Sequence, residues 1–337
     1  MRRIGIGILG CANVAKKRAL PAFKQIESVG TICIASRTVE KAKEFATEHG
    51  IEYSESYDSL LQRKDIDVIY VPLPIGLHEE WVIKAAKAGK HIICEKSLSN
   101  SLDSVRKMID CCKENKVILF ENFMCGYHPQ HLKVKETIQN GEIGTVRVLN
   151  SYFGFPPLDK NGFRYDFKLG GGSLNDAGAY TIFMSRKIFE QEPISVTCNL
   201  NIDSETKVDI SGSAFLEFPE SKVALVSFGF DNVYQNNYSL WGSQGLIKVG
   251  MAFSIPPNLS PSIMLLKNEN FQETTTSLLV PPADQFKLIF EDFINLVLYR
   301  NKEKEEKHFS DILNQAKVLE AVKISAQENR KVKLSEL

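Results

Sequence analysis

The sequence opens with a short apolar run, a turn of small residues and a helical pattern that follow one another directly. The run is Ile4-Gly5-Ile6-Gly7-Ile8-Leu9, and the turn is Gly10-Cys11-Ala12-Asn13-Val14-Ala15. The turn fits the pattern G-x-G-x-x-G/A with alanine in place of the second glycine, so the chain can turn sharply and a helix N-terminus can face a pyrophosphate. The methyl group of Ala12 lies where the backbone must approach the phosphates. This pattern predicts a dinucleotide site, although glycine-containing turns also join strands to helices in folds without one.

Strand and helix patterns alternate over the first 122 residues. Further apolar runs that indicate buried strands cover 31–35, 67–71, 91–94 and 117–120. Apolar residues at helical spacing cover 14–29, 39–49, 78–88 and 102–114. Gly50 and Gly89 stand where the second and third of these helices should end. Five apolar strands separated by helices predict a doubly wound, mostly parallel sheet of the Rossmann type, with ligands at the carboxyl ends of its strands.

A polar pair, Ser36-Arg37, comes directly after the second strand. A site for NAD usually has an acidic residue here, which binds the ribose hydroxyls. A hydroxyl and a guanidinium without an acid suit a 2′-phosphate instead, because arginine can bind phosphate through two parallel charge-assisted bonds. An exposed arginine in a turn is the alternative. The pair therefore predicts NADP(H) as the cofactor.

The third and fourth strands are followed by Pro72-Leu73-Pro74 and by Glu95-Lys96. The prolines keep the chain extended over the cofactor position, and His78 after them either begins a helix or contacts the ligand. Lys96 ends an apolar strand, so it would lie partly desolvated over the crevice with its ammonium aimed at a carbonyl group. An exposed loop lysine would have the same sequence context.

The pattern changes after Glu121-Asn122, and we expect a first domain over 1–122 and a second over 123–337. One helix ends near Gly141, and strands without helices between them follow it. These strands cover 145–153, 212–218, 222–230, 237–241 and 246–249. Helical patterns at 284–299 and 310–327 end the chain, and the charge run 302–307 between them is expected to be a solvated connection. The second domain is therefore predicted to be α+β with a large, mostly antiparallel sheet.

The second domain contains a glycine-rich segment, Gly170-Gly171-Gly172-Ser173, directly before a helical pattern. The glycines permit close approach of the backbone to a ligand, and Ser173 is the expected N-cap of the helix. Asp176 and Tyr180 are four residues apart, so on a helix they share a face and can both point toward the crevice of Lys96. An aspartate in the first turn is also favourable against the helix dipole without any catalytic role.

Charge and cysteine content argue against several classes of protein. Forty-one basic and 41 acidic residues leave no net charge, so the basic surface that nucleic-acid binding requires is not expected. No apolar run reaches the ~18 residues of a membrane span. The seven cysteines have no paired spacing that predicts disulfides or a zinc site. We therefore expect a cytoplasmic protein with reduced thiols that binds neither nucleic acid nor membranes.

Taken together, these motifs resemble the Gfo/Idh/MocA oxidoreductase family over essentially the whole chain. Within the family the sequence is most similar to the NDP-sugar 3-ketoreductases of deoxysugar biosynthesis. The stretches that carry this resemblance are Leu9-Gly10-Cys11-Ala12, Tyr70-Val71-Pro72-Leu73-Pro74, Glu121-Asn122-Phe123-Met124, His128-Pro129-Gln130-His131, Gly170-Gly171-Gly172, Asn236-Asn237-Tyr238 and Asp284-Gln285-Phe286. Ser97 replaces the proline that commonly follows Glu-Lys in the family. Tyr180 stands where many members have histidine, and this departure fits the ketoreductase branch.

The resemblance implies an enzyme that uses NADPH to reduce a keto group, at C3, of a nucleotide-linked sugar. In such an enzyme Tyr180 donates the proton, Lys96 polarises the carbonyl group, and Asp176 orients Lys96 or a substrate hydroxyl. The residues expected to bind the cofactor are Gly10, Cys11, Ala12, Asn13, Val14, Ser36, Arg37, Pro72, Leu73, His78, Glu95, Lys96, Asn122 and Arg164. A surface ion pair is the alternative for Arg164.

Two other functions fit the same residues. A dehydrogenase of a free sugar or a dihydrodiol would use this scaffold in the oxidative direction. A cofactor-sensing regulator on the same fold would not need both Lys96 and Tyr180. An open sheet with one face toward the active site must cover its other face, so we expect a homodimer or homotetramer.

Overall fold

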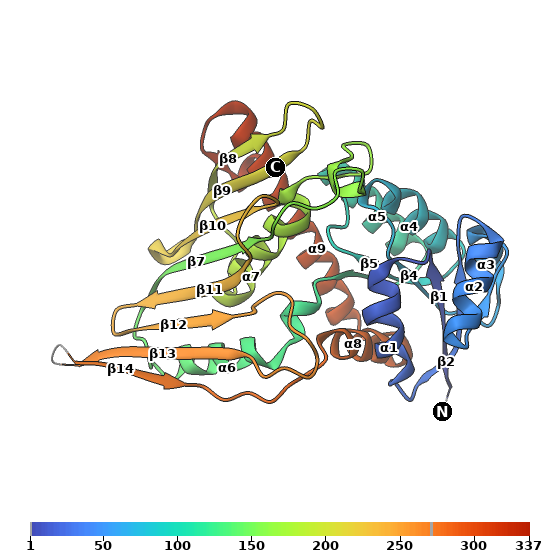
Figure 1. The fold of residues 1–337 in the computed structure, drawn as a ribbon, viewed down its shortest axis with the longest axis horizontal. Helices are drawn as coiled ribbons and strands as arrows, with labels where there is room; N and C mark the ends of the chain where they lie inside the picture. The colour runs from blue at the N-terminus through green and yellow to red at the C-terminus, as the bar shows by residue number, and fades with distance from the viewer. Residues whose placement is uncertain (1, 270–271) are drawn as a thin grey trace. The chain divides into compact units, whose positions relative to one another are not determined.

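A computed structural model describes residues 2–269 and 272–337 (Figure 1). The chain forms two compact units. The first unit contains the residues up to Asn122 together with Phe286–Ala316, and the second contains Phe123–Gln285 together with Lys317–Leu337. Residues 286–316, which the sequence patterns group with the second domain, thus pack with the first unit. In the described part of the chain, no helix combines the length and apolar character needed to cross a bilayer.

The first unit is built on a six-stranded sheet in which all neighbouring strands are parallel. Its order is β3-β2-β1-β4-β5-β6. The strands are β1 (Ile4–Leu9), β2 (Val29–Ala35), β3 (Glu52–Tyr53), β4 (Val68–Val71), β5 (His91–Glu95) and β6 (Leu119–Asn122). The doubly wound Rossmann sheet is confirmed, with β3 as an additional strand. Both residues of β3 are exposed, so this edge strand has no apolar run that sequence patterns could detect.

Helices cover both faces of this sheet (Figure 1). The helical segments of the first unit include η1 (Ala15–Ala19), α1 (Leu20–Lys24), α2 (Val39–His49), α3 (Tyr57–Gln62), α4 (His78–Lys87), α5 (Leu102–Glu114) and α8 (Gln285–Tyr299). On one face, Val82 of α4 and Met108 of α5 belong to a buried cluster with the strands. On the other, Phe23 of α1 stacks on Phe290 of α8 at 4.1 Å between ring centroids. This stacking joins α8, which follows β14 in the chain, to the first unit.

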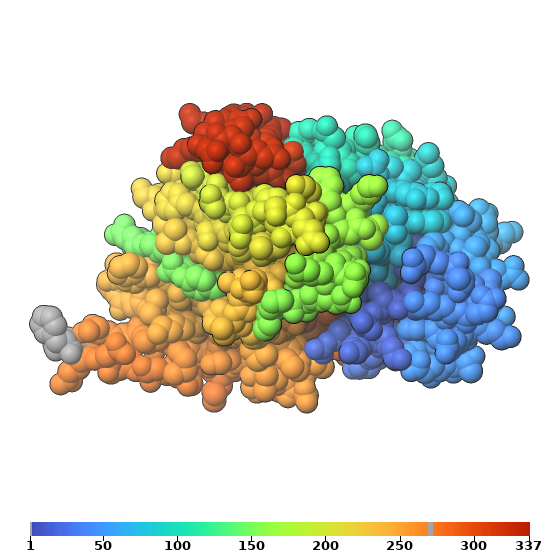
Figure 2. Space-filling model, turned by 45° about the horizontal axis from the view of Figure 1, so that its top comes forward, coloured from blue at the N-terminus to red at the C-terminus, as the bar shows by residue number. Residues whose placement is uncertain are grey.

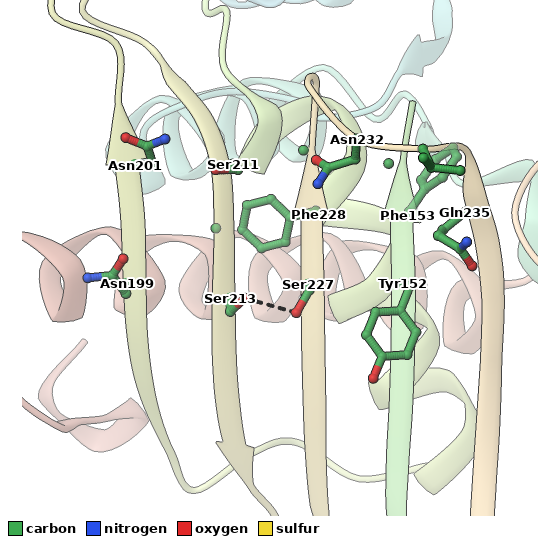
Figure 3. A pocket seen from close by; sticks show the side chains of 14 residues that line it. Tyr152, Phe153, Asn199, Asn201, Ser211, Ser213, Ser227, Phe228, Asn232 and Gln235 are labelled. Carbon is green, nitrogen blue, oxygen red and sulfur yellow. Dashed lines mark hydrogen bonds between the residues drawn. The ribbon is translucent and has the colours of Figure 1, made fainter. Parts of the chain in front are cut away.

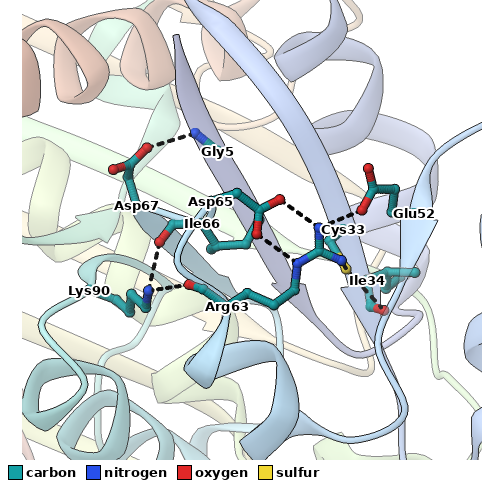
Figure 4. Close-up of polar contacts among 9 residues, drawn as sticks. All are labelled: Gly5, Cys33, Ile34, Glu52, Arg63, Asp65, Ile66, Asp67 and Lys90. Carbon is teal, nitrogen blue, oxygen red and sulfur yellow. Dashed lines mark hydrogen bonds and ion pairs between the residues drawn. The ribbon is translucent and has the colours of Figure 1, made fainter. Parts of the chain in front are cut away.

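Polar contacts tie loops together at the amino ends of the parallel strands (Figure 4). The buried Lys90 ammonium donates hydrogen bonds to the carbonyl oxygens of Arg63 at 2.6 Å and Ile66 at 2.7 Å. The N–H of Gly5 donates to the Asp67 carboxylate at 2.9 Å. Because ligands of such folds bind at the carboxyl ends, we assign this cluster a structural role.

The charge run 302–307 forms the first turns of α9 (Lys302–Glu328), so the expectation of a solvated connection is wrong. Glu303 and Glu305 lie in the first turn, where acidic side chains interact favourably with the helix dipole. Lys304 pairs with Asp292 of α8, and Lys113 of α5 donates to Glu306 at 2.7 Å. These partners come from other helices, so the local charge pattern does not reveal them.

The second unit is built on a nine-stranded sheet in the order β14-β13-β12-β11-β7-β10-β9-β8-β15. Its strands are β7 (Val146–Gly154), β8 (Ser195–Ile202), β9 (Asp209–Glu217), β10 (Val223–Gly229), β11 (Gln235–Gly242), β12 (Gly245–Gly250), β13 (Ser262–Glu269), β14 (Gln272–Ser277) and β15 (Val332–Lys333). Among the described residues β7 and β10 pair in parallel, and the other neighbours are antiparallel. The predicted α+β architecture with a mostly antiparallel sheet is confirmed.

Helices α6 (Pro129–Gln139) and α7 (Ala179–Phe189) lie on one face of this sheet (Figure 1). A π turn, η5 (Leu174–Gly178), leads directly into α7. Gly178 brings this helix close to the sheet, because a Cβ atom there would lie 2.9 Å from the Phe228 ring of β10.

The opposite face of the sheet, which we call the outer face, is lined mainly by uncharged side chains. Tyr152, Leu225 and Trp241 lie on it with 44%, 43% and 61% of their surface exposed. Between β8 and β11 it is hollowed by a cavity of about 480 Å³. The side chains that line this cavity include Tyr152, Asn199, Asn201, Ser211, Ser213, Ser227, Asn232 and Gln235 (Figure 3). The yellow and orange surface in Figure 2 belongs largely to the strands of this sheet.

Candidate active site

The turn after β1 has the conformation that the glycine pattern requires. Gly10 has a φ of +96°, and its N–H donates to the carbonyl oxygen of Ala35 at the end of β2 (2.8 Å). A Cβ atom at Gly10 would lie 3.1 Å from Leu73 Cδ2 and 3.3 Å from the Tyr57 hydroxyl. The helix begins at Asn13, so its first N–H groups follow the turn directly. The turn, the end of β2 and the segment after β4 thus lie together.

Ser36 and Arg37 lie beside this turn. Ser36 is buried, whereas Arg37 is exposed. Burial raises the pKa of the Cys11 thiol, and a hydrogen bond with the Ser36 side chain opposes this shift. Burial also raises the pKa of Tyr57, and the positive charge of Arg37 opposes it. The charge of Arg37 therefore acts on the hydroxyl of Tyr57, a residue that no sequence motif identified.

His78 begins α4 and joins two of the loops at the carboxyl ends of the strands. It is fully buried, with Nε2 2.7 Å from the carbonyl oxygen of Leu73 and Nδ1 3.1 Å from that of Leu98. Burial lowers the pKa of this imidazole. Both ring nitrogens face backbone carbonyls, so the structure assigns His78 to holding Pro72-Leu73-Pro74 next to the loop of Lys96.

Glu95 is bound from both neighbouring strands. Its Oε1 accepts hydrogen bonds from the Tyr70 hydroxyl of β4 at 2.5 Å and from the Asn122 amide of β6 at 2.6 Å. Burial raises the pKa of Glu95, and these two bonds and the charge of Lys96 oppose the shift. Next to it, Lys96 is half-buried, and the peptide bond to the buried Ser97 is cis.

The loop of Lys96 is held in place beyond Ser97 as well. The N–H of Leu98 donates to Glu121 Oε1 at 2.7 Å, and the Leu98 carbonyl contacts His78. Asn122 Oδ1 is buried and has no hydrogen-bond partner among the described residues. A buried acceptor without a partner at the carboxyl end of a parallel strand fits a polar ligand group there.

These residues fit an NADP(H) site. The turn at Gly10 has a positive φ that disfavours any other residue there, and a helix N-terminus follows it, as a pyrophosphate requires. Ser36 and Arg37 provide a hydroxyl and a guanidinium, without an acid, where a ribose phosphate would lie. The structure thus brings together the candidates at the ends of β1, β2, β4, β5 and β6.

In the second unit, the glycine-rich segment folds against residue 164. Gly172 has a φ of +118°, and its N–H donates to the Arg164 carbonyl oxygen at 2.9 Å. A Cβ atom at Gly171 would lie 2.4 Å from that same oxygen. The glycines therefore permit close approach of one backbone segment to another.

Ser173 stands at the N-cap position of η5, but its side chain does not cap the helix as the sequence predicted. Its φ of −70° and ψ of −29° are already helical, and its side chain makes no cap bond. An N-cap residue is normally extended, so that its own oxygen can reach back to the helix N–H groups. Instead, the Ser173 hydroxyl donates at 2.7 Å to Asp209 on β9, and the Leu174 N–H donates to the same carboxylate at 2.5 Å. No local sequence signal identifies Asp209.

Asp176 and Tyr180 both lie on the continuous helix formed by η5 and α7. The Asp176 carboxylate pairs with the Arg164 guanidinium, so the ion pair considered for Arg164 is present. Tyr180 is 7% exposed, and its hydroxyl contacts Met124 Sδ at 3.6 Å. The rings of Phe123 and Phe153 meet the Tyr180 ring edge-on at 5.7 and 5.3 Å between centroids. This phenol is therefore held by apolar neighbours.

Comparison with known proteins gives matches along most of the chain. Residues 4–123 match the oxidoreductase family with an NAD-binding Rossmann fold, and residues 131–248 match the GFO/IDH/MocA C-terminal domain. The chain is 33% identical over 325 residues to dTDP-3,4-didehydro-2,6-dideoxy-alpha-D-glucose 3-reductase of Actinomadura kijaniata, covering 96% of each protein. It is 31% identical over 293 residues to D-xylose 1-dehydrogenase (NADP(+)) 2 of Haloferax volcanii, covering 86% of this chain and 88% of that protein.

A solved structure is similar over the same length. It is a tyrosine-to-phenylalanine variant of a 3-ketoreductase from Actinomadura kijaniata in complex with TDP-benzene and NADP. The TM-score is 0.90 at 31% identity, covering 96% of this chain and 98% of that one. With the Rossmann sheet and the strand-end residues described above, these matches show that the chain belongs to the Gfo/Idh/MocA oxidoreductase family.

Proposed function

We propose that this protein uses NADPH to reduce a keto group, at C3, of a nucleotide-linked deoxysugar. The similarity to a dTDP-sugar 3-reductase over 96% of both proteins is the observation that carries this proposal. The solved relative was bound to NADP and TDP-benzene. The residues at the strand ends of the first unit and on the helix of the second unit supply the groups that such a reaction needs.

NADPH would be held at the carboxyl ends of the parallel strands. The turn at Gly10 and the helix that follows it would bind the pyrophosphate, and Ser36 and Arg37 would bind the 2′-phosphate. The Oδ1 of Asn122, which has no partner in the described part of the chain, offers an acceptor to a polar group of the cofactor or the substrate. When bound, NADPH supplies a hydride to the carbonyl carbon of the sugar.

Tyr180 would donate the proton to the carbonyl oxygen, and Lys96 would stabilise the negative charge that develops on it. Tyr180 is 7% exposed and its ring packs against the rings of Phe123 and Phe153, and electrostatic interactions in such buried surroundings are stronger than in water. Lys96 is fixed by the bonds of its neighbours Glu95 and Leu98. The ion pair with Arg164 would fix the position of the Asp176 carboxylate, about one helical turn before Tyr180.

Single substitutions of the two proposed catalytic residues test this mechanism. Tyr180→Phe and Lys96→Ala should each lower kcat by about 10²- to 10⁴-fold, because general acids contribute on that scale. NADPH should still bind, and the double variant should be far less than multiplicatively worse. Tyr299→Phe, the same change at an exposed tyrosine at the end of α8, is the control and should leave kcat unchanged. Near-normal kcat of Tyr180→Phe on every sugar that the native protein reduces would exclude the phenol as proton donor.

A dehydrogenase of a free sugar is the second candidate. The match to a D-xylose 1-dehydrogenase over 86% of the chain favours it. The two functions differ in whether a nucleoside diphosphate is recognised. In thermal unfolding with NADP present, dTDP should raise the melting temperature if the first proposal holds. Protection by free xylose and none by dTDP would favour the second candidate.

We further propose that the protein is a cytoplasmic homodimer or homotetramer in which copies meet through the outer face. Protein interfaces are depleted of charged residues at their core and enriched in aromatic ones. Tyr152, Leu225 and Trp241 are exposed on this face, and the cavity beside them is lined by serine, asparagine and glutamine (Figure 3). Cytoplasmic location is supported by the seven cysteines, which are free and mostly buried.

A further inference from the structure

The helix that carries Asp176 and Tyr180 receives its N-terminal cap from a distant strand. Asp209, the first residue of β9, accepts hydrogen bonds from the Ser173 hydroxyl and the Leu174 N–H, and Leu174 lies 35 residues before it in the chain. The first N–H groups of a helix have no partner within it, so an acceptor is needed there. Asp209 thus supplies from β9 what a local N-cap side chain supplies in most helices.

The Asp209 carboxylate occupies the space that a side chain at residue 172 would need. A Cβ atom at Gly172 would lie 2.3 Å from Asp209 Oδ1, so any other residue there would displace the carboxylate. The Gly172 N–H also donates to the carbonyl oxygen of Arg164, whose guanidinium pairs with Asp176. Asp209, the glycine turn and the ion pair therefore form one continuous set of contacts around the start of the helix.

The position of Asp209 is itself constrained. Burial raises the pKa of Asp209, and its bonds to Ser173 and Leu174 and the positive charge of Lys323 on α9 oppose that shift. In the same region, the Cys198 N–H of β8 donates to the Ser325 hydroxyl of α9 at 2.9 Å. The carboxylate is thus bound by the start of the helix and attracted by the positive charge of Lys323.

We propose that Asp209 is a positioning residue for the reaction, because it fixes the start of the helix that carries Tyr180. This inference rests on the proposed role of Tyr180 as proton donor. Leu174 and Tyr180 are six residues apart on the same continuous helix. Loss of the cap would let the phenol shift, and a displacement of about 1 Å can cost on the order of 10²-fold in rate.

Asp209→Ala tests the proposal against a matched control. It should lower kcat by about 10- to 100-fold while the KM for NADPH changes by less than about threefold. Asp203→Ala removes the same kinds of bond, because Asp203 Oδ2 accepts from the Thr206 N–H at 2.8 Å and the Thr206 hydroxyl at 2.7 Å. Asp203 lies in the turn between β8 and β9, so its substitution should leave kcat within about twofold. Asp209→Asn keeps an acceptor oxygen and should restore most of kcat.

Two further measurements separate positioning from general destabilisation. In the Tyr180→Phe background, Asp209→Ala should lower kcat no further, because residues that act as a unit are not additive. Amide hydrogen exchange of residues 174–178 should accelerate in Asp209→Ala and stay unchanged in Asp203→Ala. If Asp209→Ala fails to fold, Ser173→Ala removes one of the two bonds and should shift kcat and exchange in the same direction by less.

A multiplicative loss of kcat in the Tyr180→Phe background, or unchanged exchange at 174–178, would overturn the inference. A kcat of Asp209→Ala no lower than that of Asp203→Ala would also overturn it. Failure of the proposed function gives a different result, because Tyr180→Phe alone would then keep its activity while the exchange measurement still reports on the cap.

Discussion

A single buried imidazole organises the loops around the proposed cofactor site. His78 faces two carbonyl oxygens, those of Leu73 and Leu98, and carbonyl oxygens only accept hydrogen bonds. A neutral ring carries one N–H, and burial lowers the pKa of His78, which opposes the doubly protonated form. The ring therefore donates to one loop at a time while packing against both. It can organise the site without touching the cofactor.

The preference for NADP(H) depends on another single residue, Arg37. Arg37→Ala should weaken NADPH binding by about 1.5–3 kcal/mol, because a charged hydrogen-bonding partner of the 2′-phosphate is lost. This corresponds to about a ten- to a hundred-fold rise in Kd for NADPH, with little change for NADH. Fluorescence titration with both cofactors measures the difference. Lys43→Ala removes an exposed charge of α2 and should affect neither. Equal weakening of both cofactors by Arg37→Ala would contradict the assignment.

Helix α6 is joined to the sheet of the second unit by a buried polar contact. His131 Nε2 is 3.0 Å from the Ala252 carbonyl oxygen, so Nε2 carries the proton. Nδ1, 2.9 Å from the Tyr238 hydroxyl, then accepts from it. The neutral ring thus satisfies both partners, and burial lowers the pKa of His131 to about 3. Protonation would remove the acceptor and place a charge in the core.

This contact predicts acid sensitivity of the fold. His131 has a folded-state pKa of about 3, below the usual imidazole value of 6.5, so the unfolded state binds the proton first as the pH falls. Its contribution to stability is complete above pH 6.5 and is lost as the pH falls toward 3, by about 1.4 kcal/mol per pH unit.

Denaturant unfolding between pH 4 and 7 measures this slope. His131→Phe should be less stable at pH 7 and should show a pH slope smaller by about one proton. Tyr238→Phe breaks the same hydrogen bond without removing the imidazole, so it should lose stability and keep the slope. An unchanged slope in His131→Phe would mean that other groups cause the acid sensitivity.

For the whole molecule, the two sheets differ in how their faces are covered. The parallel sheet of the first unit has helices on both faces, whereas the helices of the second unit lie on one face of its sheet (Figure 1). In a monomer, Leu225 and Trp241 on the outer face are exposed to solvent. Such a face is stable in solution when a second copy covers it.

Leu225→Asp tests the assembly. A carboxylate at the centre of an interface should weaken association by more than about 2 kcal/mol, or about 30-fold in Kd, and shift the protein toward monomers. Light scattering over a concentration series measures the change. Leu132→Asp places the same charge at an exposed leucine of α6 and should leave the assembly intact. A native protein that is monomeric at micromolar concentration would exclude the proposed interface.

The sequence by itself determined the elements that depend on short stretches of chain. Apolar strands between helices predicted the parallel sheet, and Gly50 ends α2 in the left-handed conformation that its position suggested. The turn at Gly10 and the pair Ser36-Arg37 could be located because their chemistry depends on residues next to one another. The run of strands without intervening helices also predicted the mostly antiparallel sheet of the second domain. The family resemblance assigned catalytic roles to Lys96 and Tyr180, and these roles remain predictions.

Only the tertiary structure decided features that join distant parts of the chain. Asp209 caps a helix that begins 35 residues earlier, and Glu95 is bound by Tyr70 and Asn122 from the neighbouring strands. Lys304 and Glu306 at the start of α9 pair with residues of other helices. Without these partners, the charge run by itself has the composition of a solvated loop. Local patterns record the propensity and burial of a segment, whereas these contacts exist only after strands and helices distant in sequence have packed together.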